Sequence, residues 1–537
     1  MVTWREGGRA ILAHARRAAK EVEASGGTDT ARVRLARDLL HTHDGDTEFE
    51  SFARALADLT VDERHYWVGV FYTLLLSAEV RRDQAAYFTP PYLANAVLDL
   101  AVEYGFDLKK GLVLDPAAGG AAFLSTIAAR MTAEGAKADQ IAPRLRGVDI
   151  DPGLARISRG LIADRLGLGG VSKIDMQVGD ALRRRWKAEF DLVVANPPYG
   201  RITPAVLTGD HWKKVAHSGN INKYAVFAEL CLRAAKPEAL VALVVPSSFR
   251  TGPLYTKLRG YLQAQAQVLC VGDVGPRDEV FADVAQDVSV LLLRKTCADV
   301  RTDTRFCTIS ATAGVSDIGA YSLPQDQEDP WPCPTLNAMP HGGATLADYG
   351  VTAKAGYFVW NREGDRLRKA AEEGAYPLIW AKNVKPGYPC RPEGKDGKAA
   401  DFVAFDEPST SIVRQPAAVL QRTTNNKQPR RLVAAVVDPA VYARWDGFVT
   451  ENHTIVLVGE KAGNVAQVCQ LLNTAAADAR YRALSGTSAV SVQLLRTLDL
   501  PQPACLAAAA KIHTDPEKAA LAAYEASALQ SAGRHVA

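Results

Sequence analysis

The pattern of hydrophobic and polar positions changes along the chain. Up to about residue 80, apolar side chains recur at helical spacing among charged ones, as in residues 10–24 and 52–76. From Gly111 to about residue 295, short apolar runs alternate with helical stretches. The first pattern predicts a helical N-terminal segment, and the second predicts a parallel sheet covered by helices on both faces.

Seven apolar runs are the expected strands of this sheet: Leu112–Asp115, Leu145–Ile150, Ile174–Val178, Phe190–Ala195, Ala239–Val245, Val268–Val271 and Val288–Leu293. The last two have no obvious helix between them, so we expect an antiparallel hairpin at the sheet edge. Residues 301–345 are irregular and rich in proline, which indicates a domain boundary. A mixed region follows to about residue 502, and the alanine-rich stretch after it is expected to be helical.

Composition sets limits on this picture. With 537 residues, 47% hydrophobic and 23% charged, the sequence is typical of a globular protein of about three domains. A net charge of +3 does not indicate a nucleic-acid binder by itself. The longest apolar run, near residues 66–76, is shorter than the roughly 20 residues that cross a bilayer. With no secretory signal pattern and 8 scattered cysteines without a C-x-x-C pair, we expect a cytoplasmic protein with reduced thiols.

Acidic residues follow the first three predicted strands. Asp115 precedes the small residues Pro-Ala-Ala-Gly-Gly, and Asp149 and Asp180 end the next two strands. Small residues let the backbone approach a ligand closely, and the following helix N-terminus offers free N–H groups to a carboxylate. Each feature alone is also typical of a tight turn or a helix cap. Three carboxylates at one sheet edge favour a nucleoside site.

The fourth predicted strand runs directly into Asn196-Pro197-Pro198-Tyr199. Two prolines remove two backbone donors and stiffen the turn, which leaves the Asn196 amide oxygen and neighbouring carbonyls as outward-facing acceptors. A planar substrate with an NH₂ group would fit two such acceptors, with Tyr199 stacked on its face. The alternative is a merely structural turn, and the strand before it favours the substrate site.

In their order, these motifs resemble the γ-class N6-adenine DNA methyltransferases, and the TaqI type in particular. The matching segments are Phe88-Thr89-Pro90-Pro91, the loop after Asp115, Asp149, Asp180, Asn196–Tyr199, Asn222-Lys223-Tyr224 with Phe227, Val244–Ser248 and Glu279-Val280-Phe281. The resemblance is strong to residue 295 and looser to residue 502, where Pro377–Gly387 and Leu471–Thr474 are similar to target-recognition segments. Ala118 and Ala121 depart from the family, which often has a Cys and a second Gly there.

The resemblance implies an α/β fold with a Rossmann-like, S-adenosylmethionine-dependent methyltransferase domain and a mostly parallel seven-stranded sheet. An N-terminal helical extension and a C-terminal α+β target-recognition domain would complete the chain. The expected boundaries are 1–84 for the helical extension, 85–300 for the catalytic domain, 301–345 for a linker, 346–502 for the recognition domain and 503–537 for a helical tail.

It also implies methyl transfer from S-adenosylmethionine to N6 of a flipped adenine at a specific site in duplex DNA, as in a restriction-modification system. The implied cofactor contacts are Thr89, Pro90, Asp115, Ala117, Gly119, Gly120, Asp149, Asp180, Ala181, Asn196, Pro198 and Phe227. Asp149 would accept hydrogen bonds from the ribose hydroxyls, and Asp180 from the cofactor's adenine amino group. The implied catalytic residues are Asn196, Pro197, Pro198, Tyr199 and Phe281, with the two aromatic rings stacked on the target base.

A basic, amide-rich segment without acids covers residues 422–431, a composition that suits contact with phosphates and base edges. A solvated loop is the alternative. Together with the segment near residue 383, it provides the expected DNA contacts: Lys382, Asn383, Lys385, Arg422, Asn425, Asn426, Lys427, Arg430 and Arg431. The expected partners are double-stranded DNA, bound by a monomer, and a cognate restriction endonuclease; neither a metal ion nor a membrane is expected.

Three alternatives remain open. They are an N5-glutamine methyltransferase acting on translation release factors, an RNA adenine methyltransferase, and a DNA-binding subunit on a decayed methyltransferase fold. The roughly 340 residues after Tyr199 argue against the first, and the intact Asn-Pro-Pro-Tyr motif argues against the last. The sequence does not give the DNA site; a palindrome containing TCGA follows only from the TaqI resemblance.

Overall fold

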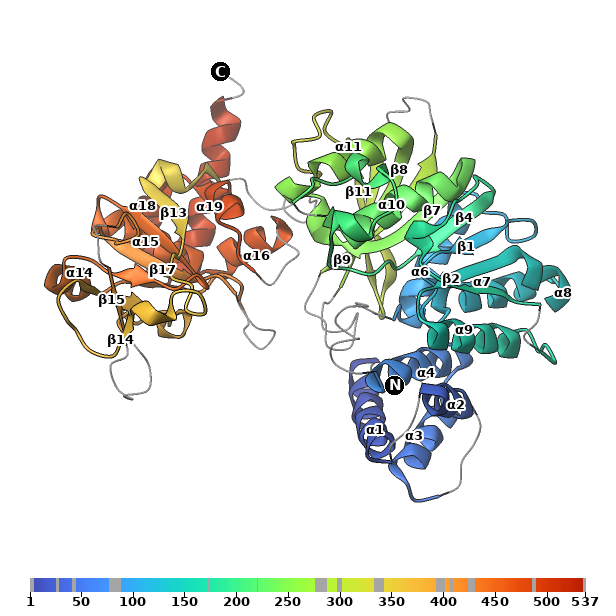
Figure 1. Ribbon diagram of the computed structural model, residues 1–537. Coiled ribbons are helices and arrows are strands. Elements are labelled where there is room, and N and C mark those ends of the chain that lie inside the picture. Colours follow the sequence, from blue (N-terminus) through green and yellow to red (C-terminus); the bar gives the residue numbers. More distant parts are fainter. Residues whose placement is uncertain are drawn as a thin grey trace. The chain divides into compact units, whose positions relative to one another are not determined.

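The computed structural model divides into two compact units, residues 1–332 and 333–537, drawn as a ribbon in Figure 1. The residues that the structure describes are 4–25, 29–40, 45–76, 88–170, 173–219, 221–275, 287–296, 302–332, 342–392, 401–405, 409–423, 430–484 and 489–534.

Four helices open the first unit: α1 (Trp4–Ala24), α2 (Asp29–Asp38), α3 (Glu48–Ala57) and α4 (Val61–Leu74). Both α3 and α4 begin with a Thr–Glu capping box, which satisfies N–H groups that a helix start leaves unpaired. The apolar side chains of these helices form one core with Leu154, Ile157 and Leu161 of a later helix. The helical N-terminal segment therefore packs directly against the sheet-containing part of the unit.

A nine-stranded sheet forms the centre of the first unit. Its strands are β1 (Val113–Asp115), β2 (Leu145–Asp149), β3 (Asp175–Val178), β4 (Phe190–Ala195), β7 (Ala235–Pro246), β8 (Ala266–Val274), β9 (Val288–Lys295), β10 (Thr304–Ser310) and β11 (Gly314–Tyr321). Their spatial order is β11-β10-β8-β9-β7-β4-β1-β2-β3. The five strands from β7 to β3 are parallel, so their carboxyl ends meet at one edge.

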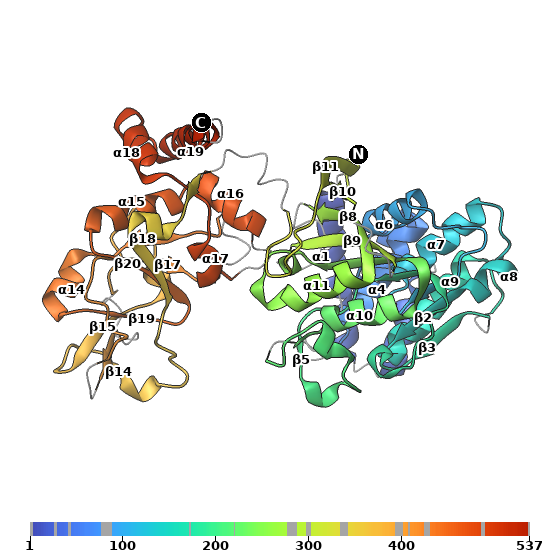
Figure 2. The ribbon, with the colours of Figure 1, turned by 90° about the horizontal axis from the view of Figure 1, so that it is seen from above.

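Helices cover both faces of the sheet, as parallel crossovers require. On one face lie α6 (Pro91–Glu103), α7 (Ala122–Ala133) and α9 (Pro152–Arg165), and on the other lie α10 (Lys223–Ala234) and α11 (Thr256–Gln265) (Figures 1 and 2). Two short elements, α8 (Ala138–Ile141) and the hairpin of β5 (Arg201–Ile202) with β6 (Ile221–Asn222), also belong to this unit. One large apolar core joins the helices to the sheet.

The predicted α/β class and the seven predicted strands are confirmed, including the antiparallel pairing of the last two. Two details were wrong. The pair is not at the sheet edge, because β9 lies between β7 and β8 while β10 pairs with β8. Part of the predicted linker, residues 304–321, forms β10 and β11, since Phe306, Cys307 and Ile309 bury their side chains where these strands extend the sheet.

Two four-stranded sheets build the second unit. One consists of β13 (Val351–Ala355), β20 (Thr454–Gly459), β17 (Ala417–Gln421) and β18 (Ala434–Val436), and the other of β14 (Leu367–Arg368), β16 (Phe402–Ala404), β15 (Ala375–Ile379) and β19 (Val449–Thr450). A short pair joins β12 (Gly343–Ala344) to β21 (Leu500–Pro501). The helices are α14 (Pro439–Trp445), α15 (Ala462–Leu472), α16 (Ala475–Leu484), α17 (Val492–Arg496), α18 (Pro503–Ile512) and α19 (Pro516–Arg534).

The alanine-rich stretch expected to be a helical tail is the pair α18 and α19. Both helices bury side chains, among them Leu506 and Tyr524, in the same core as the β13–β20 sheet. The final helices are therefore part of the second unit's fold rather than an appendage to it.

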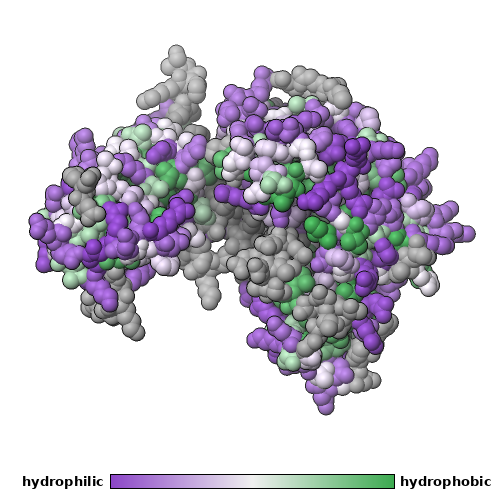
Figure 3. Space-filling model, in the orientation of Figure 1, coloured by the Kyte–Doolittle hydropathy of each residue, from purple (hydrophilic) through white to green (hydrophobic). Residues whose placement is uncertain are grey.

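The surface seen in Figure 3 is mostly hydrophilic, with small separate apolar patches. Within the described ranges, no helix combines the length and apolar character needed to cross a bilayer. The six cysteines that the structure describes are buried and form no disulfide.

Candidate functional site

A cavity of about 440 Å³ lies at the carboxyl edge of the parallel strands. It is bordered by residues that follow β1, β2, β3 and β4, together with the first turns of α10. The predicted site residues that line it are Ala117, Gly119, Asp149, Asp180, Ala181, Asn196, Pro198 and Phe227. The strand order thus brings together side chains that are up to 110 residues apart in the sequence.

The loop after β1 is tightly wound where it meets α7. Gly119 and Ala121 both have a positive φ, 51° and 57°, and Ala121 is the N-cap residue of α7. This left-handed backbone favours glycine, so the alanine at position 121 carries some strain where the family often has a glycine. Gly120 allows a close approach, because a Cβ there would lie 2.6 Å from the Phe88 ring.

Two buried carboxyl groups stand beside this loop. Asp115 accepts a hydrogen bond from the Ala117 N–H (3.0 Å), and burial raises the pKa of Asp115 to about 8. Asp149 accepts from Gly119 N–H and from Asp151 N–H, both at 2.8 Å. Burial also raises the pKa of Asp149, to about 6, although these N–H groups favour its ionised form. Asp149 lines the cavity, whereas Asp115 lies behind it.

Asp180 follows β3 and caps a short turn. Its Oδ1 accepts from the Leu182 N–H at 2.9 Å, and its Oδ2 lies 3.4 Å from the Nε of Arg183. The carboxylate therefore borders the cavity in a fixed orientation. On the opposite wall, Phe227 of α10 presents an apolar ring.

Asn196 is held from two sides at the end of β4. Its Nδ2 donates to Thr89 Oγ1 (3.2 Å). Neither Thr89 nor Pro90, the N-cap of α6, lines the large cavity. Its Oδ1 accepts from the hydroxyl of Tyr199 (2.9 Å), which is also 3.1 Å from the Val244 carbonyl.

Tyr199 is predicted to stack on the target base, and in this structure its ring is packed inside the protein. Its side chain is only 4% exposed and packs edge-on against Tyr224, with ring centroids 6.4 Å apart. The ring can stack on a base only after it leaves this position. Phe281, the other predicted stacking residue, lies outside the described residues.

The predicted DNA contacts in the second unit divide into four groups, the last of which is buried. Lys382, Lys385 and Arg422 are exposed, and Arg430 forms an ion pair with Glu517 (2.7 Å). Asn425, Asn426 and Lys427 lie outside the described residues.

The prediction that Asn383 and Arg431 contact DNA was wrong, because both residues are buried, at 5% and 4% exposed. Asn383 Oδ1 accepts from the Trp380 N–H in a helix-capping box, and the Arg431 N–H donates to Asp478. Both residues hold the fold of the second unit instead of presenting a donor to DNA.

Sequence reasoning missed several residues of the cavity wall. Ile150, directly after Asp149, is 61% exposed at the cavity, which is unusual for a large apolar side chain. Its position directly after a carboxylate at the end of a strand could have indicated that it borders the site. Val206 also borders the cavity, and no pattern in the sequence indicated it. Lys223 borders it too; it belongs to the matching segment Asn222-Lys223-Tyr224 but was not assigned a role.

Residues 65–319 match the model of the protein family described as N-6 DNA Methylase. This part of the chain is therefore similar to the N-6 DNA methylase family. The matched region contains the nine-stranded sheet almost to its end, together with every residue that lines the large cavity. The cofactor of the N-6 DNA methylase family is S-adenosylmethionine.

A curated relative is also a methyltransferase. The type II methyltransferase M.TthHB8I of Thermus thermophilus is 25% identical over 318 residues, which cover 56% of this chain and 65% of that protein. The chain thus matches just under two thirds of that relative's length.

Solved structures that match this chain include the type IIL restriction-modification enzyme MmeI in complex with DNA. It is 10% identical with a TM-score of 0.49, covering 99% of this chain and 91% of that one. The type IIG restriction endonuclease BpuSI is 13% identical with a TM-score of 0.45, covering 98% of this chain and 78% of that one.

Proposed function

We propose that this chain is a site-specific DNA methyltransferase that transfers a methyl group from S-adenosylmethionine to N6 of a flipped adenine in duplex DNA. The observation that carries the proposal is the placement of Asn196 at the end of β4, beside a cavity shared with Asp149, Asp180 and Phe227. In this proposal residues 85–300 provide catalysis and residues 346–502 read the DNA.

The cavity suits S-adenosylmethionine in size and chemistry. Its volume of about 440 Å³ lies within the 300–1,000 Å³ that is typical of small-molecule sites. The exposed side chain of Ile150 and the ring of Phe227 provide apolar surface for the adenine. Asp149 would accept hydrogen bonds from the ribose hydroxyls, and Asp180 from the adenine amino group. The uncapped N-terminus of α7 offers N–H groups for the carboxylate of the methionine part.

The catalytic task is to make a poor nucleophile reactive. The lone pair of adenine N6 is delocalised into the ring, and S-adenosylmethionine supplies an electrophilic methyl group on a sulfonium. Asn196 Oδ1 and the Pro197 carbonyl would accept the two N6 hydrogens, which draws the nitrogen toward tetrahedral geometry and directs its lone pair at the methyl group. The same acceptors stabilise the positive charge that develops on N6. Holding the two reactants together adds a proximity effect of several kcal/mol.

A duplex hides adenine N6, so the base must leave the stack, which costs a few kcal/mol. Tyr199 and Phe281 would repay part of that cost by stacking. Lys382, Lys385 and Arg422 would contact the DNA, with Asn425, Asn426, Lys427 and Arg430 nearby in sequence. We further propose that the protein acts as a monomer in the cytoplasm, as the modification enzyme of a restriction-modification system with a cognate endonuclease.

The test is to incubate the purified full-length protein with plasmid DNA and S-adenosylmethionine carrying a labelled methyl group. Modified adenines are then mapped by modification-sensitive sequencing. We expect label at one short sequence, and a loss of at least about 100-fold in the Asn196→Ala variant, because one of the two N6 acceptors is removed. Label in RNA or protein but not in DNA, or full activity of Asn196→Ala, would reject the proposal.

A further inference from the structure

Helix α4 presents one face to the loops that border the proposed cofactor cavity. Asp62, His65, Gly69 and Tyr72 are spaced three, four and three residues apart, which places them on the same side of a helix. His65, Gly69 and Tyr72 each lie against a residue in, or close to, the loop after β1 or the loop after β2. Asp62 forms an ion pair with Arg165, the last residue of α9. We call these four residues the α4 face.

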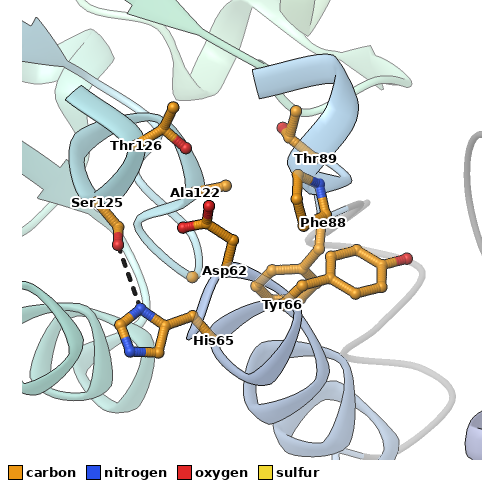
Figure 4. Close-up of a pocket in the computed structure, with 10 residues that line it drawn as sticks. Asp62, His65, Tyr66, Phe88, Thr89, Ala122, Ser125 and Thr126 are labelled. Carbon is orange, nitrogen blue, oxygen red and sulfur yellow. Dashed lines mark hydrogen bonds between the residues drawn. The ribbon is translucent and has the colours of Figure 1, made fainter. Parts of the chain in front are cut away.

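At one end of this face, the buried His65 side chain belongs to a polar network that reaches the surface at Asp164. Its Nδ1 lies 3.2 Å from Ser125 Oγ, in the first turns of α7 (Figure 4). Its Nε2 lies 3.4 Å from Asp164 Oδ2. Arg165 donates to Ser125 Oγ at 3.1 Å and forms an ion pair with Asp62.

The chemical groups in this network determine which atom donates and which accepts in each hydrogen bond. A carboxylate only accepts and a guanidinium only donates, so Nε2 of a neutral His65 carries the hydrogen and Nδ1 accepts from Ser125. Burial, the largest effect, lowers the pKa of His65 and favours this neutral form. The first turns of α7, whose N-terminus faces the cofactor loop, are thereby tied to α4.

In the middle of the face, α4 packs against the cofactor loop through one aromatic ring. A Cβ on Gly69 would lie 2.7 Å from Phe88, and a Cβ on Gly120 would lie 2.6 Å from the same ring. Phe88 is therefore held between α4 and the loop after β1, and it lines both the large cavity and the small pocket of Figure 4. Only glycine at both positions allows this spacing.

At the other end, Tyr72 reaches the loop after β2. Its hydroxyl donates to Asp151 Oδ1 (3.0 Å), and the Asp151 N–H donates to Asp149 Oδ1 (2.8 Å). Asp151 also caps α9 through the Leu154 N–H (2.8 Å). Tyr72 thus orients the residue that orients Asp149.

We propose that the α4 face positions both cofactor-binding loops, so that the N-terminal helices serve S-adenosylmethionine binding rather than DNA recognition. This inference rests on the proposed function, since it assumes that the large cavity binds that cofactor. His65 and Tyr72 are positioning residues: they act through Ser125 and Asp151, and neither lines the large cavity. Apolar residues would fill the same space, but they would not fix the orientation of these loops.

The experiment measures binding of S-adenosylmethionine to full-length variants by calorimetry, alongside DNA binding by fluorescence anisotropy and thermal unfolding. Tyr72→Phe keeps the ring and removes only the hydroxyl, and we expect the dissociation constant for S-adenosylmethionine to rise about three- to tenfold. KM for S-adenosylmethionine should rise with it, while kcat and the dissociation constant for DNA stay within about twofold.

Two substitutions at His65 test whether its hydrogen bond positions α7 or whether the side chain only fills space. The amide of asparagine lies near the former Nδ1, and that of glutamine lies near the former Nε2. His65→Asn should therefore keep the link to Ser125 and the affinity for S-adenosylmethionine, whereas His65→Gln should weaken binding about three- to tenfold. Arg17→Ala, which removes an exposed ion pair of the same helical group, is the matched control and should change nothing.

The outcomes separate this inference from the proposed function. If the wild-type protein does not bind S-adenosylmethionine, the proposed function fails. If it binds but Tyr72→Phe and His65→Gln bind equally well, the α4 face has no positioning role. Equal losses of cofactor and DNA binding that follow a lower unfolding temperature would also overturn it, because they indicate a role in folding alone.

Discussion

At the scale of single residues, two neighbouring carboxyl groups control the electrostatics of the cavity. Burial raises the pKa of Asp115 to about 8 and that of Asp149 to about 6. At pH 7 Asp115 is therefore mostly protonated and Asp149 mostly ionised. The two groups do not repel each other in that state, and the ionised one is the one that borders the cavity.

Asp149 predicts a pH dependence of cofactor affinity. Ribose hydroxyls donate to a carboxylate, so binding selects the ionised form, and the fraction of that form falls as the pH drops through about 6. The affinity should be full above pH 7 and about tenfold lower at pH 5. Calorimetric titration with S-adenosylhomocysteine between pH 5 and 8 measures it. Asp149→Asn should bind more weakly with a flat profile; a profile parallel to the wild type would exclude Asp149.

The raised pKa of Asp149 also makes the stability of the fold depend on pH. A carboxyl with a raised folded-state pKa stabilises the fold at pH values below its unfolded value of 3.8, and this contribution is lost as the pH rises through about 6. The ligand-free Asp149→Asn variant should therefore unfold at a higher temperature than the wild type at pH 8, a difference that thermal unfolding followed by circular dichroism measures. A lower unfolding temperature at pH 8 would contradict this sign.

Tyr199 can be tested by separating its hydroxyl from its ring. Tyr199→Phe removes one hydrogen-bond donor to Asn196 Oδ1 and keeps the stacking surface, so methylation should stay within about threefold of the wild type. Tyr199→Ala removes stacking worth about 1–3 kcal/mol, which should raise KM for DNA roughly 5- to 150-fold. Steady-state methylation of a duplex measures both. Similar losses in the two variants would show that the hydroxyl, rather than the ring, is needed.

At the scale of elements, a side chain of α11 forms hydrogen bonds to the segment that follows β11. Arg259 is completely buried, and its guanidinium donates to the carbonyls of Phe249, Gly252, Gln327 and Glu328 at 2.9–3.3 Å. Nearby, Trp331 packs edge-on against Phe249 with ring centroids 5.4 Å apart. A single side chain thus connects the start of α11 to residues 327–328.

Arg259→Ala should lower the free energy of unfolding by about 3 kcal/mol or more, because several buried carbonyls lose their donor. Arg259→Lys should restore only part of this, since an ammonium group lacks the planar fork. Urea denaturation followed by fluorescence measures both. Gln265→Ala, exposed at the end of the same helix, is the control and should change stability by less than about 0.5 kcal/mol. A small effect of Arg259→Ala would show that water replaces the guanidinium.

The elements also show how far the sequence alone leads. Buried strands such as Phe190–Ala195 were predictable because they are continuous apolar runs, and the strand-end motifs then located the cavity. β10 was not predicted, since Thr304–Ser310 mixes polar and apolar residues and lies next to a proline-rich stretch. The roles of His65 and Tyr72 depend on which helices pack together, and the burial of Tyr199 depends on Tyr224 and Val244. No local pattern encodes such contacts.

At the scale of the whole molecule, a net charge of +3 hides local differences. Carboxyl groups border the proposed cofactor cavity in the first unit, while exposed basic residues such as Lys382, Lys385 and Arg422 belong to the second. Because exposed charges act over about 10 Å at ordinary salt, the local groups and not the total decide which ligand each surface attracts.

This division predicts separable effects on the two ligands. Replacing Lys382, Lys385 and Arg422 together by alanine should weaken DNA binding and reduce the slope of log affinity against log salt by about one for each lost phosphate contact. Cofactor binding, which depends on the first unit, should not change. Fluorescence anisotropy at several salt concentrations and calorimetry measure the two.

The control removes the same charge from another part of the second unit. Lys461, Lys511 and Lys518 are exposed and lie outside the predicted recognition segments, so replacing them by alanine changes the net charge equally. If this control loses as much DNA affinity and salt slope as the first variant, binding follows total charge, and the three recognition residues have no special role. If only the first variant loses DNA affinity and salt slope, the three recognition residues contact phosphates. Long-range attraction between exposed charges would not explain the difference, because it is screened at the higher salt concentrations.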